Sequence, residues 1–217
     1  MSLTLIVHRR KPRLLDLCCG AGGAAVGYAR AGFDVTGVDI TPQSSYPFTF
    51  HQDDALTFDL SGFDAYHVSP PCKYWSQATG FHPGAREKHT PLIDPMRQRI
   101  VSTGLPYILE NVERAPLLNP VKLCGHMFGL CVYRHRIFES NVLLLQPRHR
   151  KHMARAAAPG AIARDGEFWS VGGHFGHKED AARAMGIDWM KRVEEIAQAI
   201  PPVYTECLGL QLMEVFR

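Results

Sequence analysis

The stretch RLLDLCCGAGG, residues 13–23, constrains the fold more than any other part of the chain. Its first five residues are mostly apolar and predict a buried strand, and the glycines that follow predict a tight turn. From Gly23 to Gly32, small and apolar residues recur at the spacing of a helix. A strand, a glycine-rich turn and a helix in this order are typical of α/β proteins in which the turn approaches a ligand.

The same alternation continues along the chain. The stretches DVTGVDI, FDAYHVS and PYILENV predict strands, and LIDPMRQRIVSTG has a helical pattern despite Pro95. Further on, YRHRIFES and NVLLLQ are expected to form paired strands, and VYTECLGLQLMEVF a final helix. Alternating strands and helices build a mostly parallel sheet with helices on both faces. We therefore expect one α/β domain over residues 1–217.

Composition narrows the class of protein. Hydrophobic residues make up 46% of the chain and charged residues 21%, which is ordinary for a globular protein. No apolar run reaches the roughly 18–20 residues of a membrane span, and residues 1–13 lack the pattern of a signal peptide. A cytoplasmic, monomeric protein with reduced cysteines is expected. The net charge of +3 indicates no particular partner.

Acidic residues stand where the predicted strands end. Asp39 closes the second strand, roughly 20 residues after the glycines, where an acid meets the ribose hydroxyls in nucleoside-binding sheets. Asp54 closes the presumed third strand, where we expect an adenine edge. A glycine turn alone would be only a tight connection, but together these residues favour a nucleoside cofactor. The sequence has no G-x-x-x-x-G-K-[ST] motif, which argues against a nucleotide phosphate loop.

Five stretches, in this order, resemble motifs of the cytosine-C5 methyltransferase family of DNA-modifying enzymes. LLDLCCGAGG resembles the cofactor motif, SPPCKYWSQ the Pro-Cys nucleophile loop, and ENVE the Glu-Asn-Val motif. YRHRIF resembles the Arg-x-Arg strand, and QAIPPVYTECLG the last motif, which returns to the cofactor pocket. The resemblance covers nearly the whole chain and is closest to short, phage-type members.

The resemblance implies a Rossmann-like methyltransferase fold, S-adenosylmethionine as the cofactor, and DNA as the partner in a bacterial or phage-infected cell, with a role such as restriction-modification. A thiolate that adds at C6 of cytosine makes C5 nucleophilic enough to take a methyl group. A carboxyl group that protonates N3 eases this addition, and arginines on one face of a strand can neutralise developing charge. The catalytic residues implied are Cys72, Glu110, Asn111, Arg134 and Arg136.

The resemblance also implies a cofactor pocket and a DNA contact. The pocket comprises Asp16, Cys18, Gly20, Gly22, Gly23, Asp39, Ile40, Asp54, Pro71 and Gln198. Expected DNA contacts are Lys73 and, in the basic segment QPRHRKHMAR, the residues Arg148, Arg150 and Lys151, for which a solvated loop is the alternative. Residues 140–184 leave room only for a reduced target-recognition insert, so we expect a short or degenerate target site. The base must be flipped out of the duplex to reach the site.

Some positions depart from the family, and other functions stay open. Ala197-Gln198 stands where the family has Gly-Asn, and Val132 where it has glutamine. The alternatives are C5 methylation of cytosine in RNA, such as transfer RNA, and a non-catalytic cofactor- or DNA-binding subunit that needs a partner. Cys124, His126 and Cys131 lack the paired ligand spacing of a zinc site, so no metal is expected.

Overall fold

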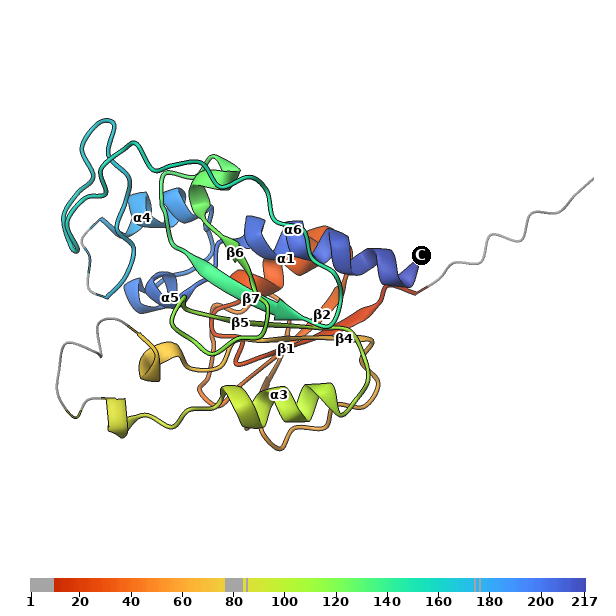
Figure 1. Cartoon of the computed structure of the whole chain (residues 1–217). Helices are drawn as coiled ribbons and strands as arrows, with labels where there is room; N and C mark the ends of the chain where they lie inside the picture. Colours follow the sequence, from red (N-terminus) through yellow and green to blue (C-terminus); the bar gives the residue numbers. More distant parts are fainter. Residues whose placement is uncertain (1–9, 77–83, 85, 174, 176) are drawn as a thin grey trace, which may run out of the picture.

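A mixed sheet forms the centre of the computed structural model, which describes residues 10–76, 84, 86–173, 175 and 177–217 (Figure 1). Within these residues, seven strands lie in the order β3-β2-β1-β4-β5-β7-β6. The strands are β1 Arg13–Leu17, β2 Asp34–Asp39, β3 Thr49–Gln52, β4 Ala65–Val68, β5 Tyr107–Asn111, β6 Val121–Leu123 and β7 Arg136–Ser140.

Strand direction decides where functional side chains meet. β1 pairs in parallel with both β2 and β4, and β4 pairs in parallel with β5. β7 runs antiparallel to β5 and β6. The carboxyl ends of β1, β2, β4 and β5 therefore share one edge of the sheet, and the chain enters β7 at that same edge. Ligands of open α/β sheets bind at this edge.

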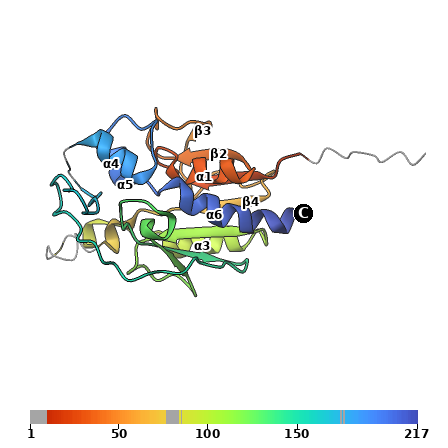
Figure 2. The same cartoon turned by 90° about the horizontal axis from the view of Figure 1, so that it is seen from above.

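Helices cover both faces of the sheet, as the sequence predicts. In Figures 1 and 2, α1 and α6 lie together on one face and α3 lies on the other. The α-helices are α1 Gly23–Ala31, α3 Ile93–Val101, α4 Lys178–Met185, α5 Val193–Gln198 and α6 Pro202–Met213. Short 3-10 helices are η1 Cys72–Tyr74, η2 Arg86–Lys88, η3 Gly125–Phe128 and η4 Glu214–Phe216. Among the described residues, none of these helices combines the length and apolarity that a membrane crossing requires.

The two faces of the sheet bury separate apolar cores. Leu14 and Ile108 pack under α1 and α6, whereas Leu15 and Leu109 pack against α3. The alternation follows from the two-residue period of a strand, and each such fully buried side chain contributes about 1.5–3 kcal/mol. α1 and α6 touch closely at Gly27, where a Cβ would lie 2.1 Å from the carbonyl oxygen of Pro202 and from Thr205 Oγ1.

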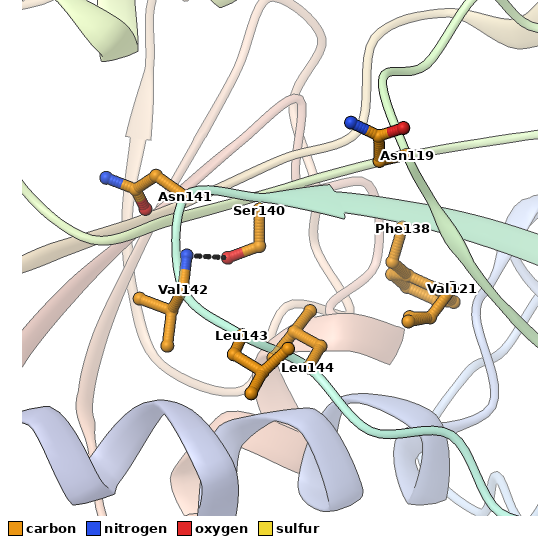
Figure 3. A pocket seen from close by; sticks show the side chains of 8 residues that line it. All are labelled: Asn119, Val121, Phe138, Ser140, Asn141, Val142, Leu143 and Leu144. Atoms are coloured by element: carbon orange, nitrogen blue, oxygen red, sulfur yellow. Dashed lines mark hydrogen bonds between the residues drawn. The ribbon is translucent and has the colours of Figure 1, made fainter.

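One predicted strand pairing is wrong. NVLLLQ forms no strand, and β7 pairs instead with β6, which the sequence did not indicate. After β7 the backbone turns away, where the Val142 amide donates a 3.0 Å hydrogen bond to Ser140 Oγ (Figure 3). A pocket of about 260 Å³ opens there, lined by residues that include Val121 and Leu144. The pocket lies at the carboxyl end of β7, whereas Arg136 is at the other end of this strand. It is therefore away from the sheet edge formed by the carboxyl ends of β1, β2, β4 and β5.

The chain between β7 and α4 is irregular. Within its described residues it has no helix or strand, only isolated bridges that join Ala156 to Phe168 and Trp169 to Val132. Val171 packs with α4 and α5 in a third apolar cluster. This segment corresponds to the insert expected at residues 140–184, whose role in recognition stays a prediction.

Candidate active site and cofactor pocket

The corner that carries Cys72 follows β4 directly. The chain passes through Pro70 and Pro71 and enters η1 at Cys72. The Nδ2 amide of Asn111 donates a 2.9 Å hydrogen bond to the carbonyl of Pro70. Because Asn111 is fully buried at the end of β5, this bond ties the corner to the neighbouring strand. Cys72 is half-buried, and Lys73 next to it is exposed.

Glu110 and Arg136 form an ion pair beside this corner. Nε of Arg136 lies 3.1 Å from Oε1 of Glu110, and both side chains are largely buried. They meet because β5 and β7 are antiparallel, with Glu110 opposite Phe138. Burial raises the pKa of Glu110, and the charge of Arg136 only partly opposes this rise. Glu110 therefore holds a proton more readily than an exposed glutamate.

A polar chain continues behind Glu110 into the core. The Ser69 hydroxyl favours the carboxylate form of Glu110 and so lowers its pKa, and the Ser69 Oγ lies 2.8 Å from Nε2 of His67. Nδ1 of His67 lies 2.9 Å from the Tyr28 hydroxyl. Burial lowers the pKa of His67 to about 3, so the imidazole is neutral. Sequence reasoning missed these residues, and the only signal was the polar side chain of His67 within the otherwise apolar strand β4.

The expectation that Arg134 and Arg136 share one strand face is wrong. β7 begins only at Arg136, and Arg134 precedes it with a left-handed φ of 31°. Its guanidinium donates 2.7 Å hydrogen bonds to the carbonyls of Ala197, Ala199 and Val171. Arg134 thus holds the last motif in place instead of pointing outward beside Arg136.

Arg134 nevertheless lies within electrostatic range of the other expected catalytic groups. Burial and the positive charge of Arg136 lower the pKa of Arg134 to about 9. The charges of Glu110 and Cys72 have the opposite effect and raise the pKa of Arg134. The structure thus brings Cys72, Glu110, Asn111 and both arginines to one edge of the sheet.

The glycine-rich turn after β1 leaves room for a ligand. φ is 50° at Gly20 and 85° at Gly22, conformations that favour glycine. Apart from Gly20 and its two chain neighbours, no described atom lies within 4 Å of where a Cβ on Gly20 would stand. Cys18 also has a positive φ, of 58°, and burial raises its pKa to about 12, so its thiol stays protonated.

The acidic strand ends lie next to this turn. Asp39 Oδ2 accepts a 3.0 Å hydrogen bond from the amide of Gly20, and Oδ1 accepts one from the amide of Thr41. Ile40 is 68% exposed, an unusual state for a large apolar side chain. Asp54 is also exposed, and its Oδ1 accepts a hydrogen bond from the amide of Leu56. A carboxylate, an exposed apolar surface and open backbone are groups that the ribose and base of a nucleoside can contact.

Asp16 is a buried carboxyl group below the turn. Neither of its oxygens has a hydrogen-bond partner at normal geometry within the described residues. Burial raises its pKa well above the usual range, and the negative charge of Asp39 raises it further, while the Tyr46 hydroxyl partly opposes both. A buried acid without a full set of partners is typical of a site that a polar ligand completes.

The last motif returns to the glycine turn, as the resemblance implies. A Cβ on Gly23 would lie 2.5 Å from the carbonyl oxygen of Ile200, so only glycine fits there. Gln198 ends α5 and is exposed, as is Pro71. Trp189 Nε1 donates a 2.9 Å hydrogen bond to the carbonyl of Ala21, which anchors the same region to the turn.

The basic segment presents its charges to solvent. Arg148, Arg150 and Lys151 are exposed and form no ion pair within the described part of the chain. The neighbouring side chains of His149 and His152 turn inward, toward the residue that precedes β7. The charged side chains are therefore available to a phosphate backbone.

The strand order, the antiparallel β7 and the glycine turn after β1 define the Rossmann-like fold of S-adenosylmethionine-dependent methyltransferases. A protein assigned as a DNA modification methyltransferase encoded within an E. coli prophage has a TM-score of 0.69 to this chain, at 15% identity, over 95% of this chain and 99% of the other. Dnmt2 methyltransferase of S. pombe has a TM-score of 0.60 at 12% identity, with 95% and 100% covered. The methyltransferase EhMeth of Entamoeba histolytica has 0.61 at 10% identity, with 96% and 100% covered.

Sequence comparison reaches less of the chain. No family model matches it. A protein named as a methyltransferase, YqeM of Bacillus subtilis, is 38% identical over 64 residues. This match spans only a quarter of this chain and a quarter of that relative's length.

Proposed function

We propose that this protein transfers a methyl group from S-adenosylmethionine to C5 of a flipped-out cytosine in DNA. The observation that carries the proposal is the meeting of the Cys72 corner with the Glu110–Arg136 pair at the edge that also holds the glycine turn. A nucleophile, an acid and a cation are the groups that addition to a pyrimidine ring requires. The prophage protein of similar fold supports DNA as the substrate.

The residues of the chain divide the chemistry between them. The Cys72 thiolate adds to C6 of cytosine while Glu110 delivers a proton to N3. Arg136 holds Glu110 and stabilises charge on the ring, and Asn111 keeps the corner in position. After methylation, transfer of the C5 proton to solvent water expels the Cys72 thiolate and restores the aromatic ring, and the N3 proton returns to Glu110.

The cofactor pocket fits S-adenosylmethionine by its donor set. The Asp39 carboxylate would accept hydrogen bonds from the ribose hydroxyls. Ile40 would cover the face of the adenine ring, and Asp54 would lie at its edge. The open backbone at Gly20 and the polar groups at Asp16 would face the amino-acid end. When bound, this cofactor supplies the electrophilic methyl group on its sulfonium sulfur.

DNA contact is assigned to exposed cations near the site. Lys73 flanks the nucleophile, and Arg148, Arg150 and Lys151 lie on the irregular segment after β7. Contacts of this kind go to phosphates and carry no sequence information. Together with the reduced insert at residues 140–184, they favour a short or degenerate target site.

Labelled methyl transfer tests the proposal. The protein is incubated with labelled S-adenosylmethionine and either duplex DNA or transfer RNA, and the digested nucleosides are separated. We expect label in 5-methyldeoxycytidine, and none with Cys72→Ala. Label only in RNA would overturn the DNA substrate, label in N4-methyldeoxycytidine would overturn the C5 chemistry, and no label in either nucleic acid would favour a non-catalytic subunit.

A further inference from the structure

Four potential metal ligands converge where the chain enters β7. Cys124, His135, His149 and His152 each place one ligand atom so that all four atoms lie within 4.8 Å of one another. Cys124 follows β6, and His135 directly precedes β7. The two other histidines come from the basic segment. Three separate stretches of chain thus point their ligand atoms at one place.

Three of the distances between these ligand atoms are close to the edge length of a zinc coordination tetrahedron. Nε2 of His149 lies 3.2 Å from Nε2 of His135 and 3.2 Å from Nε2 of His152. Sγ of Cys124 lies 3.4 Å from Nε2 of His152. Bonds of about 2.0–2.1 Å to nitrogen and about 2.3 Å to sulfur around tetrahedral zinc place the ligand atoms about 3.3–3.6 Å apart.

Hydrogen bonds alone do not account for this arrangement. A ring nitrogen of neutral histidine either donates one proton or accepts one. Nε2 of His149 is in contact with two other Nε2 atoms, of His135 and His152. In either neutral tautomer this nitrogen offers only one lone pair or one N–H group, so it cannot form a full hydrogen bond in both contacts. A cation at the centre satisfies the lone pairs of all three rings at once.

We propose that Cys124, His135, His149 and His152 bind a Zn²⁺ ion. Four protein ligands close the coordination shell, which is the pattern of a structural site and not of a catalytic one. Cys124 is buried and His135 and His152 are half-buried, whereas His149 is the most exposed of the four ligands. The proposal departs from the sequence-based expectation of no metal, which rested on the spacing of Cys124 with residues 126 and 131.

Surrounding groups fix the orientation of the ligands. The second ring nitrogen of His135, Nδ1, faces a carboxylate oxygen of Glu113 at 3.9 Å. The ring of Tyr133 stacks on His152 at 3.6 Å, and its hydroxyl donates a 2.5 Å hydrogen bond to the carbonyl of Ala154. Outer groups of this kind orient metal-bound imidazoles in known sites.

The ion would clamp the basic segment against the arginine segment. His149 stands between Arg148 and Arg150, and His152 directly follows Lys151, so fixing the two histidines fixes the direction in which these cations point. This consequence rests on the proposed function, whereas binding of the ion does not.

Metal analysis of tag-free protein, purified under reducing conditions and dialysed, tests the site. We expect nearly stoichiometric zinc in the wild type and a loss of at least tenfold in Cys124→Ser and His149→Ala. His126→Ala is the matched control, since this ring lies 6.1 Å from the His152 ring but outside the ligand set, and it should keep its zinc. Equal zinc in wild type and both ligand variants, or loss only in the control, would overturn the proposal.

Cobalt substitution keeps the test independent of whether variants fold. Wild-type protein stripped by a chelator and reloaded with Co²⁺ should show the intense visible bands of tetrahedral cobalt and a thiolate-to-cobalt charge-transfer band. A wild type that holds no zinc and takes up neither zinc nor cobalt would refute the site. Cobalt bound with octahedral bands and no thiolate band would refute the ligand set. Neither result depends on methyl transfer.

Discussion

Nε of Arg136 lies 3.1 Å from Oε1 of Glu110, in a place where both side chains are largely buried. Burial favours the neutral acid and the arginine favours the carboxylate, so the two effects compete over one proton. The net result is a raised pKa for Glu110. A glutamate in this state can deliver a proton to a substrate and recover it afterwards, which is the role assigned to it.

Changing the arginine should move the pH dependence of the reaction. If protonated Glu110 is the active form, the rate falls as pH rises through its pKa. Arg136→Met removes the charge that lowers this pKa, so the alkaline limb of the single-turnover rate should move to higher pH, and the rate itself should fall about 10²–10⁴-fold. Arg30→Met, in an exposed pair with Glu206, should leave the limb unchanged. A limb that stays in place or moves to lower pH would contradict the assignment.

Asn111 at the end of β5 and Asn141, which follows β7 and binds the start of β5, separate a positioning role from a stabilising one. Asn111→Ala removes the hydrogen bond to the Pro70 carbonyl, which should cost about 1–3 kcal/mol of unfolding free energy and lower kcat. Asn141→Ala removes bonds to the Leu105 carbonyl and the Tyr107 amide, far from Cys72, and should cost stability alone. Urea denaturation and single-turnover rates of folded protein measure the two effects. Equal kcat losses in both variants would show that Asn111 has no positioning role.

Arg134 is expected to act through the cofactor pocket. Its three hydrogen bonds hold the carbonyls of Ala197, Ala199 and Val171, and Ile200 next to them packs on Gly23. Arg134→Lys keeps the charge but cannot reproduce the fork of donors. We expect cofactor affinity to weaken about tenfold, since each such lost bond costs on the order of 1 kcal/mol. Calorimetry with S-adenosylhomocysteine measures it, and unchanged affinity with a reduced rate would assign Arg134 to the base instead.

A buried ion pair away from the site should dominate acid sensitivity. Glu139 accepts hydrogen bonds from Arg97, from the Tyr107 hydroxyl and from the Leu118 amide. Although burial opposes them, these partners lower the pKa of Glu139. Its contribution to stability is therefore present above the pKa of an unfolded glutamate, about 4.3, and is lost as pH falls through the lower folded value.

Arg97→Met should remove about 3–5 kcal/mol at neutral pH because it leaves the carboxylate buried and unpaired. Chemical denaturation at neutral and acidic pH measures this difference, which should shrink in acid as Glu139 is protonated. A loss that is the same at both pH values would mean that packing, and not charge, is responsible.

The sequence predicts the central elements because their patterns are local. A short, leucine-rich stretch before a glycine turn indicates β1, and helical spacing indicates α1 and α3. β6 was missed because three residues, Val121–Leu123, are too few to show a period. NVLLLQ looked like a strand because it is apolar, yet Leu143 is 82% exposed and only Leu144 is buried among its leucines.

The sequence identifies residues of the candidate site only where they lie in a recognisable motif. Cys72 and Glu110 lie in motifs of the resembling family, and the parallel strands β4 and β5 bring them to one edge. The turn of the Arg134 side chain toward the last motif depends on a positive φ, which the alternation of a strand does not reveal. Cys124 and His152 are 28 residues apart and meet only through the fold, so no spacing rule indicates them.

Trapping of the covalent adduct tests the central claim most directly. DNA that contains 5-fluorocytosine blocks the last step, because fluorine at C5 cannot leave as a proton does. With S-adenosylmethionine, wild-type protein should accumulate a denaturation-resistant protein–DNA complex, and peptide mapping should place the bond on Cys72. A wild type that methylates ordinary DNA without forming the adduct, or an adduct that persists in Cys72→Ser, would contradict the account.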